Sequence, residues 1–174
     1  MLIGERVRLR PARETDLDTI FRLRGETRTT GEHWRVRLQS EFLERRQFLE
    51  TGWWSEDRGF LVILDGAERI LGRITYFRPT FYLDTYEIGY RIYRPNDRGK
   101  GYTTEAVALL TDYLFASKPI RRIQAATLPA NMASRRVLEK CGFSLEGIMR
   151  GAFFYQGAFQ DLCLYAVLSE TRKS

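Results

Sequence analysis

The stretch Arg98-Gly99-Lys100-Gly101-Tyr102-Thr103 lies between two segments whose hydrophobic patterns differ. Before it, Tyr86, Ile88, Tyr90 and Ile92 alternate with Glu87, Gly89, Arg91 and Tyr93, and this period of two is typical of a β-strand. After it, the apolar residues of 106–114 recur at spacings of three and four, which indicates an amphipathic helix. The two glycines therefore lie where a strand leads into a helix. Bare amide N–H groups and the positive end of the helix dipole favour an anion there, so the stretch predicts a phosphate-binding loop.

Two common phosphate loops do not fit this stretch. A Walker loop needs a lysine directly after its second glycine, but Gly101 is followed by Tyr102. The dinucleotide fingerprint needs glycine or alanine three residues after Gly101, where the sequence has Thr104. What remains, Arg98-Gly99-x-Gly101, resembles the acetyl-CoA pyrophosphate loop of the GNAT superfamily of N-acetyltransferases. The strict pattern, Arg/Gln-x-x-Gly-x-Gly/Ala, would need glycine at position 103, so the match is to the looser form of the ribosomal-protein N-terminal acetyltransferase branch.

A second block supports the same resemblance. Residues 131–143 are similar to the Asn-x-x-Ser-x-x-Val-x-Glu-Lys-x-Gly-Phe segment of that branch. In physical terms, Asn131 can cap the start of a helix and Gly142 can end it. The stripe expected to be buried consists of Ala133, Val137, Leu138 and Cys141. A capped helix without a function would fit this block alone, but the order of the two blocks, with a predicted strand at 122–128 between them, favours the family.

The composition is that of one soluble domain, 1–174, long enough to bury a core. The net charge of +6 is spread among interleaved acids, so a nucleic-acid-binding domain is supported by net charge alone. His33 has no partner at ligand spacing, and Cys141 and Cys163 are interpreted as small core residues, so no metal is expected. No apolar run reaches membrane-spanning length and the N-terminus lacks a signal-peptide core. We therefore expect a cytoplasmic location, no membrane and no specific nucleic acid.

The elements read along the chain in the order β-α-α-β-β-β-α-β-α-β-β. Besides the two helices already described, after the phosphate loop and after Asn131, we expect a strand at 2–10, a helix from Asp16 to about Arg24 capped by Thr15, and a helix from Ser40 to Leu49 with Phe42, Leu43, Phe48 and Leu49 buried. Strands are expected at 59–64, 70–77, 85–93 and 122–128, and closing strands at 143–154 and 159–168, joined through Gln156-Gly157. This predicts an α/β fold with a mixed, mostly antiparallel central sheet, helices on both faces and one parallel crossover at the phosphate loop. The order equals that of the GNAT fold.

The resemblance implies acetyl-CoA as co-substrate. Its expected binding residues are Ile88, Tyr90, Ile92, Arg98, Gly99, Lys100, Gly101, Tyr102, Thr103, Asn131, Ser134 and Arg135. Residues 87–92 would lend backbone groups to the pantetheine and the thioester, with the side chains of Tyr90 and Ile92 used for packing. Arg98 and Lys100 would supply charge to the phosphates.

Acetyl transfer from a thioester needs an amine that loses its proton and a stabilised leaving thiolate. Glu87 is the candidate base, since a lone carboxylate in a half-buried strand has a raised proton affinity. The alternatives are an exposed glutamate paired with an arginine, and water as the base. Many relatives have a tyrosine seven residues beyond the asparagine, but here that position is Leu138. The role passes to Ser134, which otherwise is a plain residue of the first helical turn.

The expected function is transfer of the acetyl group to the primary amine of a protein N-terminus or a small molecule, by direct attack in a ternary complex. An acetyltransferase for a small-molecule amine, such as an antibiotic or a polyamine, is one alternative, and a CoA-binding regulatory module without turnover is another. A homodimer is left open. The aromatic residues that the resemblance puts near the acceptor, and that packing would also explain, are Trp34, Trp53, Trp54, Phe77, Phe81, Tyr82, Phe153, Phe154 and Tyr155.

Overall fold

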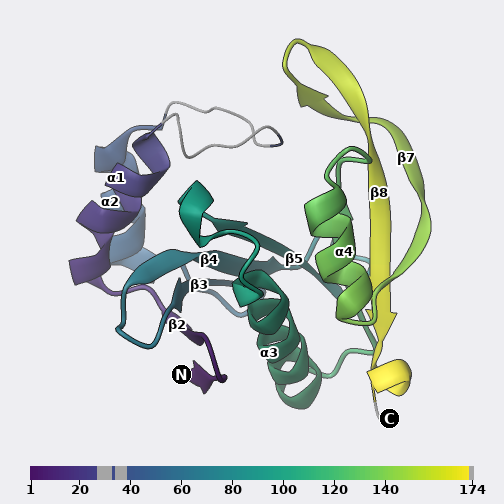
Figure 1. The fold of residues 1–174 in the computed structure, drawn as a ribbon, viewed down its shortest axis with the longest axis horizontal. Helices are drawn as coiled ribbons and strands as arrows, with labels where there is room; N and C mark the ends of the chain where they lie inside the picture. Colours follow the sequence, from purple (N-terminus) through teal and green to yellow (C-terminus); the bar gives the residue numbers. More distant parts are fainter. Residues whose placement is uncertain (27–32, 34–38, 173–174) are drawn as a thin grey trace.

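The computed structural model describes residues 1–26, 33 and 39–172 (Figure 1). The strands are β1 (Leu2–Ile3), β2 (Arg8–Pro11), β3 (Arg58–Leu64), β4 (Ile70–Phe77), β5 (Thr85–Ile92), β6 (Arg122–Thr127), β7 (Ser144–Tyr155) and β8 (Ala158–Leu168). The α-helices are α1 (Leu17–Gly25), α2 (Glu41–Thr51), α3 (Tyr102–Ser117) and α4 (Met132–Lys140), and the short 3-10 helices are η1 (Glu14–Asp16), η3 (Pro95–Asp97) and η4 (Ser169–Arg172).

The strands of the described residues form one eight-stranded sheet in the order β1-β2-β3-β4-β5-β6-β8-β7. β5 and β6 pair in parallel, and the other neighbours pair antiparallel. A parallel pair needs a crossover, and α3 supplies it directly after the phosphate loop. The predicted mixed, mostly antiparallel sheet with one crossover is confirmed.

The two faces of the sheet carry different helices (Figure 1). Alternate residues of β3 point to opposite faces: Leu61 and Ile63 belong to the larger core cluster with α3 and α4, and Phe60, Val62 and Leu64 to a second cluster with α1. α2 joins the second face through Trp53, whose ring lies 5.1 Å from that of Phe48 and 4.8 Å from that of Phe60. Helices on both faces were predicted, and the structure confirms this.

The N-terminal part differs from the prediction in two places. The single strand expected at 2–10 is two short strands, β1 and β2, separated by a turn in which the Gly4 amide donates to the Val7 carbonyl at 2.9 Å. Thr15 does not cap the first helix. Instead Asp16 is buried, accepts from the Arg13 amide at 2.7 Å and forms a two-pronged ion pair with Arg10 at 2.6 and 3.0 Å. A buried charge pair fixes this helix start where a hydroxyl cap was expected.

α2 begins where it was predicted and ends two residues beyond the predicted Leu49, but its buried face was predicted wrongly. Ser40 caps the helix and Gly52, at φ 63°, ends it. Of the four residues expected to be buried only Phe48 is, whereas Phe42, Leu43 and Leu49 are 71%, 52% and 66% exposed. The reason is that the inner face of α2 is largely polar and lines a cavity, described below. Ala133 on α4 is likewise exposed, while Leu138 and Cys141 are buried as expected.

The later turns follow the prediction. Gly142 adopts φ 82° directly after α4, and Gln156 and Gly157, at φ 49° and 81°, form the link between β7 and β8. Left-handed conformations of this kind are those that favour glycine and tight hairpin turns. Cys141 and Cys163 are buried and free, as predicted for small core residues.

Candidate functional site

The strand β5 parts from its neighbour β6 halfway along its length. The parallel pairing covers only Thr85, Tyr86 and Glu87, opposite residues 122–124. From Ile88 to Ile92, β5 pairs with β4 on one side, and no described strand pairs with its other side. A stretch of β5 therefore presents unpaired backbone groups within the sheet, which a bound extended molecule could use.

The backbone groups on this free edge belong to the residues that the sequence indicated. The Tyr93 amide donates to the Leu71 carbonyl at 2.9 Å and the Gly89 carbonyl accepts from Thr75 Oγ1 at 3.2 Å, so these odd-numbered residues face β4. Because successive residues of a strand point their N–H and C=O groups to opposite edges, those of Ile88, Tyr90 and Ile92 face away from β4. Their binding of the co-substrate remains a prediction.

The phosphate loop has the backbone conformation that its glycines allow. Gly99 and Gly101 adopt φ 75° and 82°, and Gly101 is the N-cap of α3. Within the described residues, no acceptor is paired with the amide N–H groups of residues 99 to 103. Such a turn leading into a helix N-terminus is an anion-binding arrangement. The side chains of Tyr102 and Thr103 lie in the first turn of α3, next to these amides.

The cations around the loop differ from those predicted. Arg98 turns back and donates to the carbonyls of Ile92 and Tyr93 at 3.4 and 3.2 Å, so it ties the loop to the end of β5. Arg6, which the sequence did not suggest, donates through Nη1 to the Lys100 carbonyl at 3.3 Å. Its backbone amide is held by the Glu105 carboxylate at 3.0 and 3.2 Å. Arg6 and Lys100 are thus exposed cations at the loop.

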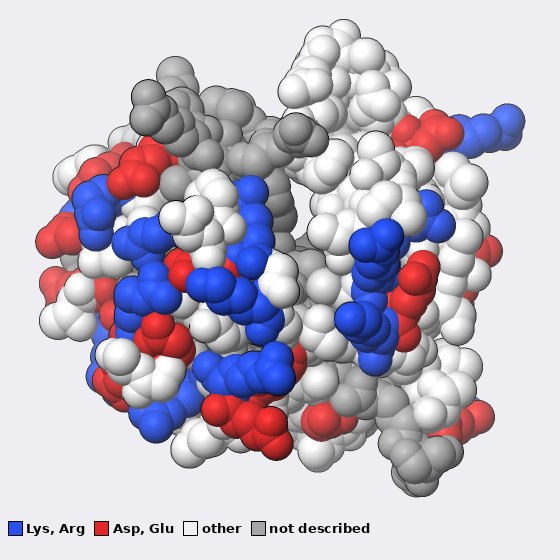
Figure 2. Space-filling view, in the orientation of Figure 1, with Lys and Arg blue, Asp and Glu red and all other residues white. Residues whose placement is uncertain are grey.

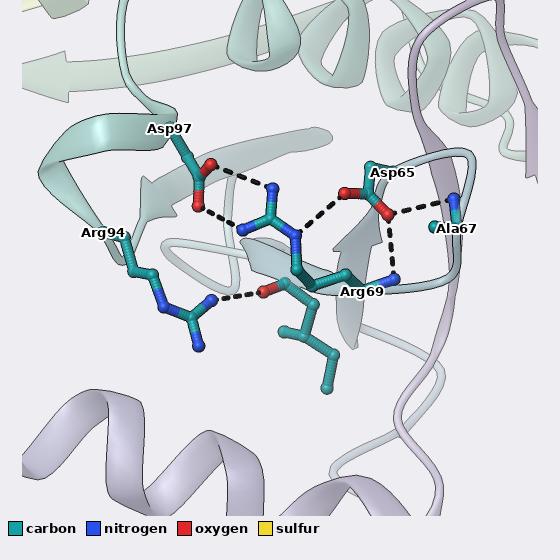
Figure 3. Close-up of polar contacts among 6 residues, drawn as sticks. Asp65, Ala67, Arg69, Arg94 and Asp97 are labelled. Atoms are coloured by element: carbon teal, nitrogen blue, oxygen red, sulfur yellow. Dashed lines mark hydrogen bonds and ion pairs between the residues drawn. The ribbon is translucent and has the colours of Figure 1, made fainter.

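An ion-pair cluster fixes the segment that leads into the loop (Figure 3). Arg69 binds the buried Asp97 of η3 through two bonds of 3.0 Å, and its Nε donates to Asp65 at 3.0 Å. Asp65 also accepts from the amides of Ala67 and Arg69 at 3.1 and 2.9 Å. Burial raises the pKa of Asp65, but the hydrogen bonds from Arg69 outweigh it and lower the pKa overall. The turn between β3 and β4 thereby anchors η3.

The start of α4 lies across the gap from the free edge of β5. Asn131 caps α4 as predicted, since its Oδ1 accepts from the Ser134 amide at 3.1 Å. The Tyr90 hydroxyl lies 2.9 Å from Ser134 Oγ and donates to the Ser134 carbonyl at 3.3 Å. Burial raises the pKa of Tyr90, which keeps its hydroxyl protonated. Tyr90 was expected only to pack, and this contact across 44 residues of sequence gives it a polar role.

Arg135, also expected at the co-substrate, makes its described contacts on the other side of α4. Its Nε donates to the Tyr165 hydroxyl of β8 at 3.0 Å, and its Nη1 to the Pro129 carbonyl at 3.4 Å. Figure 2 shows a hollow between α4 and the segment that leads from β5 into α3, with basic side chains along both sides. Arg135 helps to hold α4 against β8 at one side of the molecule.

Glu87 is the last residue of β5 that pairs with β6, so it lies where the two strands separate. Its side chain is half-buried and accepts from Gln124 Nε2 at 2.9 Å. Burial raises the pKa of Glu87, and the Gln124 hydrogen bond opposes this only in part. Among the described residues no arginine or lysine forms an ion pair with Glu87, so the alternative of an exposed, arginine-paired glutamate does not apply.

A cavity of ≈ 380 Å³ lies on the face of the sheet that carries α1 and α2, and the pairing of Phe77 with Glu87 puts the Glu87 side chain on this same face. β4 contributes Phe77, which lies directly opposite Glu87 in the sheet, and α2 contributes a polar face. The described residues that line the cavity are Arg24, Gln39, Glu44, Gln47, Thr51, Trp53, Trp54, Ser55, Arg58, Gly59, Phe60, Arg73, Thr75 and Phe77. Glu87 is not among these lining residues, but Phe77, its neighbour across the sheet, is one of them, so we take the cavity and the free edge of β5 as the two parts of the candidate site.

The aromatic residues predicted near the acceptor fall into three groups. Trp53, Trp54 and Phe77 line the cavity. Phe81 and Tyr82 lie in the link between β4 and β5 and are 93% and 69% exposed. The other three, Phe153, Phe154 and Tyr155, belong to the hairpin of β7 and β8, and Trp34 lies outside the described residues.

Two further observations concern metals and membranes. In the described part of the chain, no group of three or more His, Cys, Asp or Glu side chains is arranged to hold a metal ion. None of the helices in that part is long and apolar enough to cross a membrane.

Comparison with known proteins gives consistent matches over nearly the whole chain. The family model described as "Acetyltransferase (GNAT) domain" matches residues 6–144. A probable N-acetyltransferase, YjcK, of Bacillus subtilis is 31% identical, over 97% of each chain. The ribosomal-protein-serine acetyltransferase of Escherichia coli is 24% identical, over 98% of this chain and 97% of its own. The crystal structure of spermidine N-acetyltransferase from Vibrio cholerae with CoA and spermine has a TM-score of 0.82 at 21% identity and covers 95% of this chain and 96% of its own.

Proposed function

The chain belongs to the GNAT family and is an N-acetyltransferase with acetyl-CoA as its co-substrate, and we propose that it acetylates the primary amine of a protein N-terminus or a small molecule by direct attack in a ternary complex. The observation that carries this proposal is the free edge of β5. It runs from Ile88, directly after Glu87, to Ile92, which Arg98 of the phosphate loop contacts. At about 3.3 Å per residue this edge is roughly 13 Å long, so one extended arm can lie along it.

The residues of the loop end would hold the co-substrate. The amides of residues 99 to 103 suit a pyrophosphate, and Lys100 and Arg6 add positive charge beside them. The backbone groups of Ile88 and Tyr90 and the amide of Ile92, whose carbonyl accepts from Arg98, would bind the pantetheine arm along the edge, as an added strand does. The side chain of Asn131 caps α4, so its contribution is to place Ser134.

The residues of the cavity end would carry the proton transfers. The amine reaches the site as an ammonium ion, and Glu87, whose pKa is raised, accepts its proton directly or through one water. The amine nitrogen then bonds to the carbonyl carbon of the thioester, the carbon–sulfur bond breaks, and the second proton of that nitrogen passes to the departing thiolate, directly or through one water, which gives the amide and the free thiol. Ser134 Oγ would donate a hydrogen bond to the departing thiolate, while Tyr90 orients the Ser134 hydroxyl.

Thiol release from acetyl-CoA, measured against peptides with different N-terminal residues, polyamines and aminoglycosides, tests this function. We expect release that depends on one class of amine, with the acetylated amine identified by mass. Tight acetyl-CoA binding without acetylation of any amine would contradict turnover and leave a CoA-binding regulatory module.

A further inference from the structure

The charge of the cavity is unusual for a site that receives an ammonium ion. Its described lining has three guanidinium groups, from Arg24, Arg58 and Arg73, and one carboxylate, from Glu44. That carboxylate is already neutralised, since Arg24 binds it through two bonds of 2.5 and 3.0 Å. In the described structure, neither Arg58 nor Arg73 has a carboxylate within ion-pair distance.

Arg73 is half-buried in the cavity wall, and its guanidinium carbon lies 5.8 Å from the centre of the Phe60 ring. Burial and the charges of Arg24 and Arg58 lower the pKa of Arg73. Arg91 lies opposite Arg73 in the sheet, and burial together with Arg73 lowers the pKa of Arg91 to about 10. Guanidinium groups gathered in this way at a half-buried site create a positive potential that an anion would relieve.

The arrangement in the sheet places this positive charge close to Glu87. Arg58, Phe77 and Glu87 lie in one row across β3, β4 and β5, so Arg58 is two strands, roughly 10 Å, from Glu87. Arg73 lies on the same face of β4 as Phe77, four residues before it, so these two residues are roughly 13 Å apart. Both side chains line the one cavity. A molecule with an ammonium group at Glu87 would thus bring its other end to the two arginines.

We propose that the acceptor is an amine that also carries an anionic group, a carboxylate or a phosphate, which binds Arg73 and Arg58 while the amine meets Glu87. This inference rests on the proposed function and narrows its acceptor class. It separates the chain from the spermidine acetyltransferase that shares its fold, since a polyamine would bring a second ammonium group against unpaired arginines.

The test compares amines that differ only at the far end. One set is 4-aminobutyrate, 3-aminopropyl phosphate, 4-aminobutanamide and 1,4-diaminobutane. The other is a short peptide with an N-terminal serine followed by Glu, Gln or Lys. With saturating acetyl-CoA, we expect kcat/KM for the anionic members to exceed that of the amide at least about tenfold, and that of the diamine by more. The phosphate and carboxylate members decide which anion is preferred.

Variants then test whether the arginines of the cavity cause the preference for amines with an anionic group. In Arg73→Gln, the ratio of carboxylate to amide should fall to about one, mainly through KM for the amine, with KM for acetyl-CoA unchanged. Arg73→Lys should keep part of the preference. The matched control is Arg22→Gln, which removes the same charge from an exposed position on α1, where the nearest described carboxylate, that of Glu26, lies 4.0 Å away. Glutarate, which has no amine, should inhibit competitively against the amine in the control and not in Arg73→Gln.

The outcomes separate the two proposals. A wild-type enzyme that prefers the amide or the diamine overturns the inference and leaves the acetyltransferase proposal standing. An unchanged carboxylate preference in both Arg73→Gln and Arg58→Gln also overturns it. If the protein binds acetyl-CoA but acetylates none of these amines, the proposed function fails and the inference fails with it.

Discussion

The phosphate loop and the cavity that we propose takes the acceptor are built from different parts of the chain. The loop presents main-chain amides, held open by the left-handed conformations of Gly99 and Gly101. The cavity presents side chains from α1, α2, β3 and β4, with Arg73 and Glu44 among them. Main-chain donors recognise a pyrophosphate that every acetyl-CoA enzyme shares, whereas side chains can change one at a time and so set the acceptor.

Substitution of Glu87 tests the proposed base, and the largest effect is expected here. Glu87→Gln should lower kcat by roughly two to four decades, the usual contribution of a general base. Glu87 must be ionised to accept a proton, so the wild-type rate should fall as the pH drops through its raised pKa. The variant should lack this acidic limb. Full turnover with an unchanged limb would mean that water or another residue is the base; unchanged acetyl-CoA affinity is the control.

A substitution that disturbs the backbone of the phosphate loop should weaken acetyl-CoA binding, whereas Glu87→Gln should lower kcat. Gly101→Asp forces a side chain onto φ 82°, and a Cβ there would lie 2.7 Å from Arg6 Nη1. A carboxylate would also stand where the phosphate binds, so acetyl-CoA affinity should fall by about 2–4 kcal/mol.

Calorimetric titration measures this loss. Gly157→Asp is the matched control, because Gly157 has a similar φ of 81°, a Cβ there meets nothing within 4 Å, and it lies in the turn between β7 and β8. An unchanged affinity in a folded Gly101→Asp protein would show that the pyrophosphate binds elsewhere.

Loss of the hydrogen bond between the Ser134 and Tyr90 hydroxyls should lower kcat and leave the affinity for acetyl-CoA unchanged. Ser134→Ala and Tyr90→Phe should each lower kcat by about one to two decades, because one hydrogen bond to the leaving sulfur is lost or misdirected. If the two hydroxyls act as a unit, the double variant should be little worse than either single one. Rates that simply multiply in the double variant would show that Tyr90 does not act through Ser134.

The contrast between the regions also explains what the sequence could reveal. The loop, the Asn131 cap and the Gln156-Gly157 turn follow from residues close together in the chain, and each was predicted. Arg6 lies 94 residues from the carbonyl it contacts, and Tyr90 lies 44 residues from Ser134, so neither contact has a local signal. The order of the elements along the chain was read from the sequence patterns and equals that of the GNAT fold, but the spatial order of the strands in the sheet was not predicted, because periodicity carries no long-range pairing.

The acceptor cavity was missed because helix periodicity does not say which stripe faces inward. In α2, Phe42, Leu43 and Leu49 were expected inside because they are apolar. The inner stripe is instead Glu44, Gln47, Phe48 and Thr51, at the same spacings of three and four. A polar stripe facing a sheet costs burial free energy unless it borders a solvated site, and that cost is itself a signal of function.

Arg69, directly before β4, and Arg73, on β4, should contribute differently to the free energy of unfolding. Arg69 satisfies the buried Asp97, and Arg69→Met would leave that carboxylate without its partner. Because the Arg69 side chain is 47% exposed, we expect a loss of about 1–2 kcal/mol in the free energy of unfolding. Since Asp97 holds η3, KM for acetyl-CoA should rise as well. Denaturant unfolding checks the first effect, and an unchanged midpoint would contradict the anchoring role.

Arg73→Gln should have the smallest effect on stability and the opposite sign. Its guanidinium has no carboxylate partner in the described structure, and burial beside Arg24 and Arg58 disfavours its charged form. Removing the charge relieves this repulsion, while the loss of contact with Phe60 offsets part of the gain. The free energy of unfolding should therefore stay the same or rise by up to about 1 kcal/mol. A clear destabilisation would show that Arg73 is a structural residue whose charge is satisfied within the fold, and the anion-binding cavity would lose its main support.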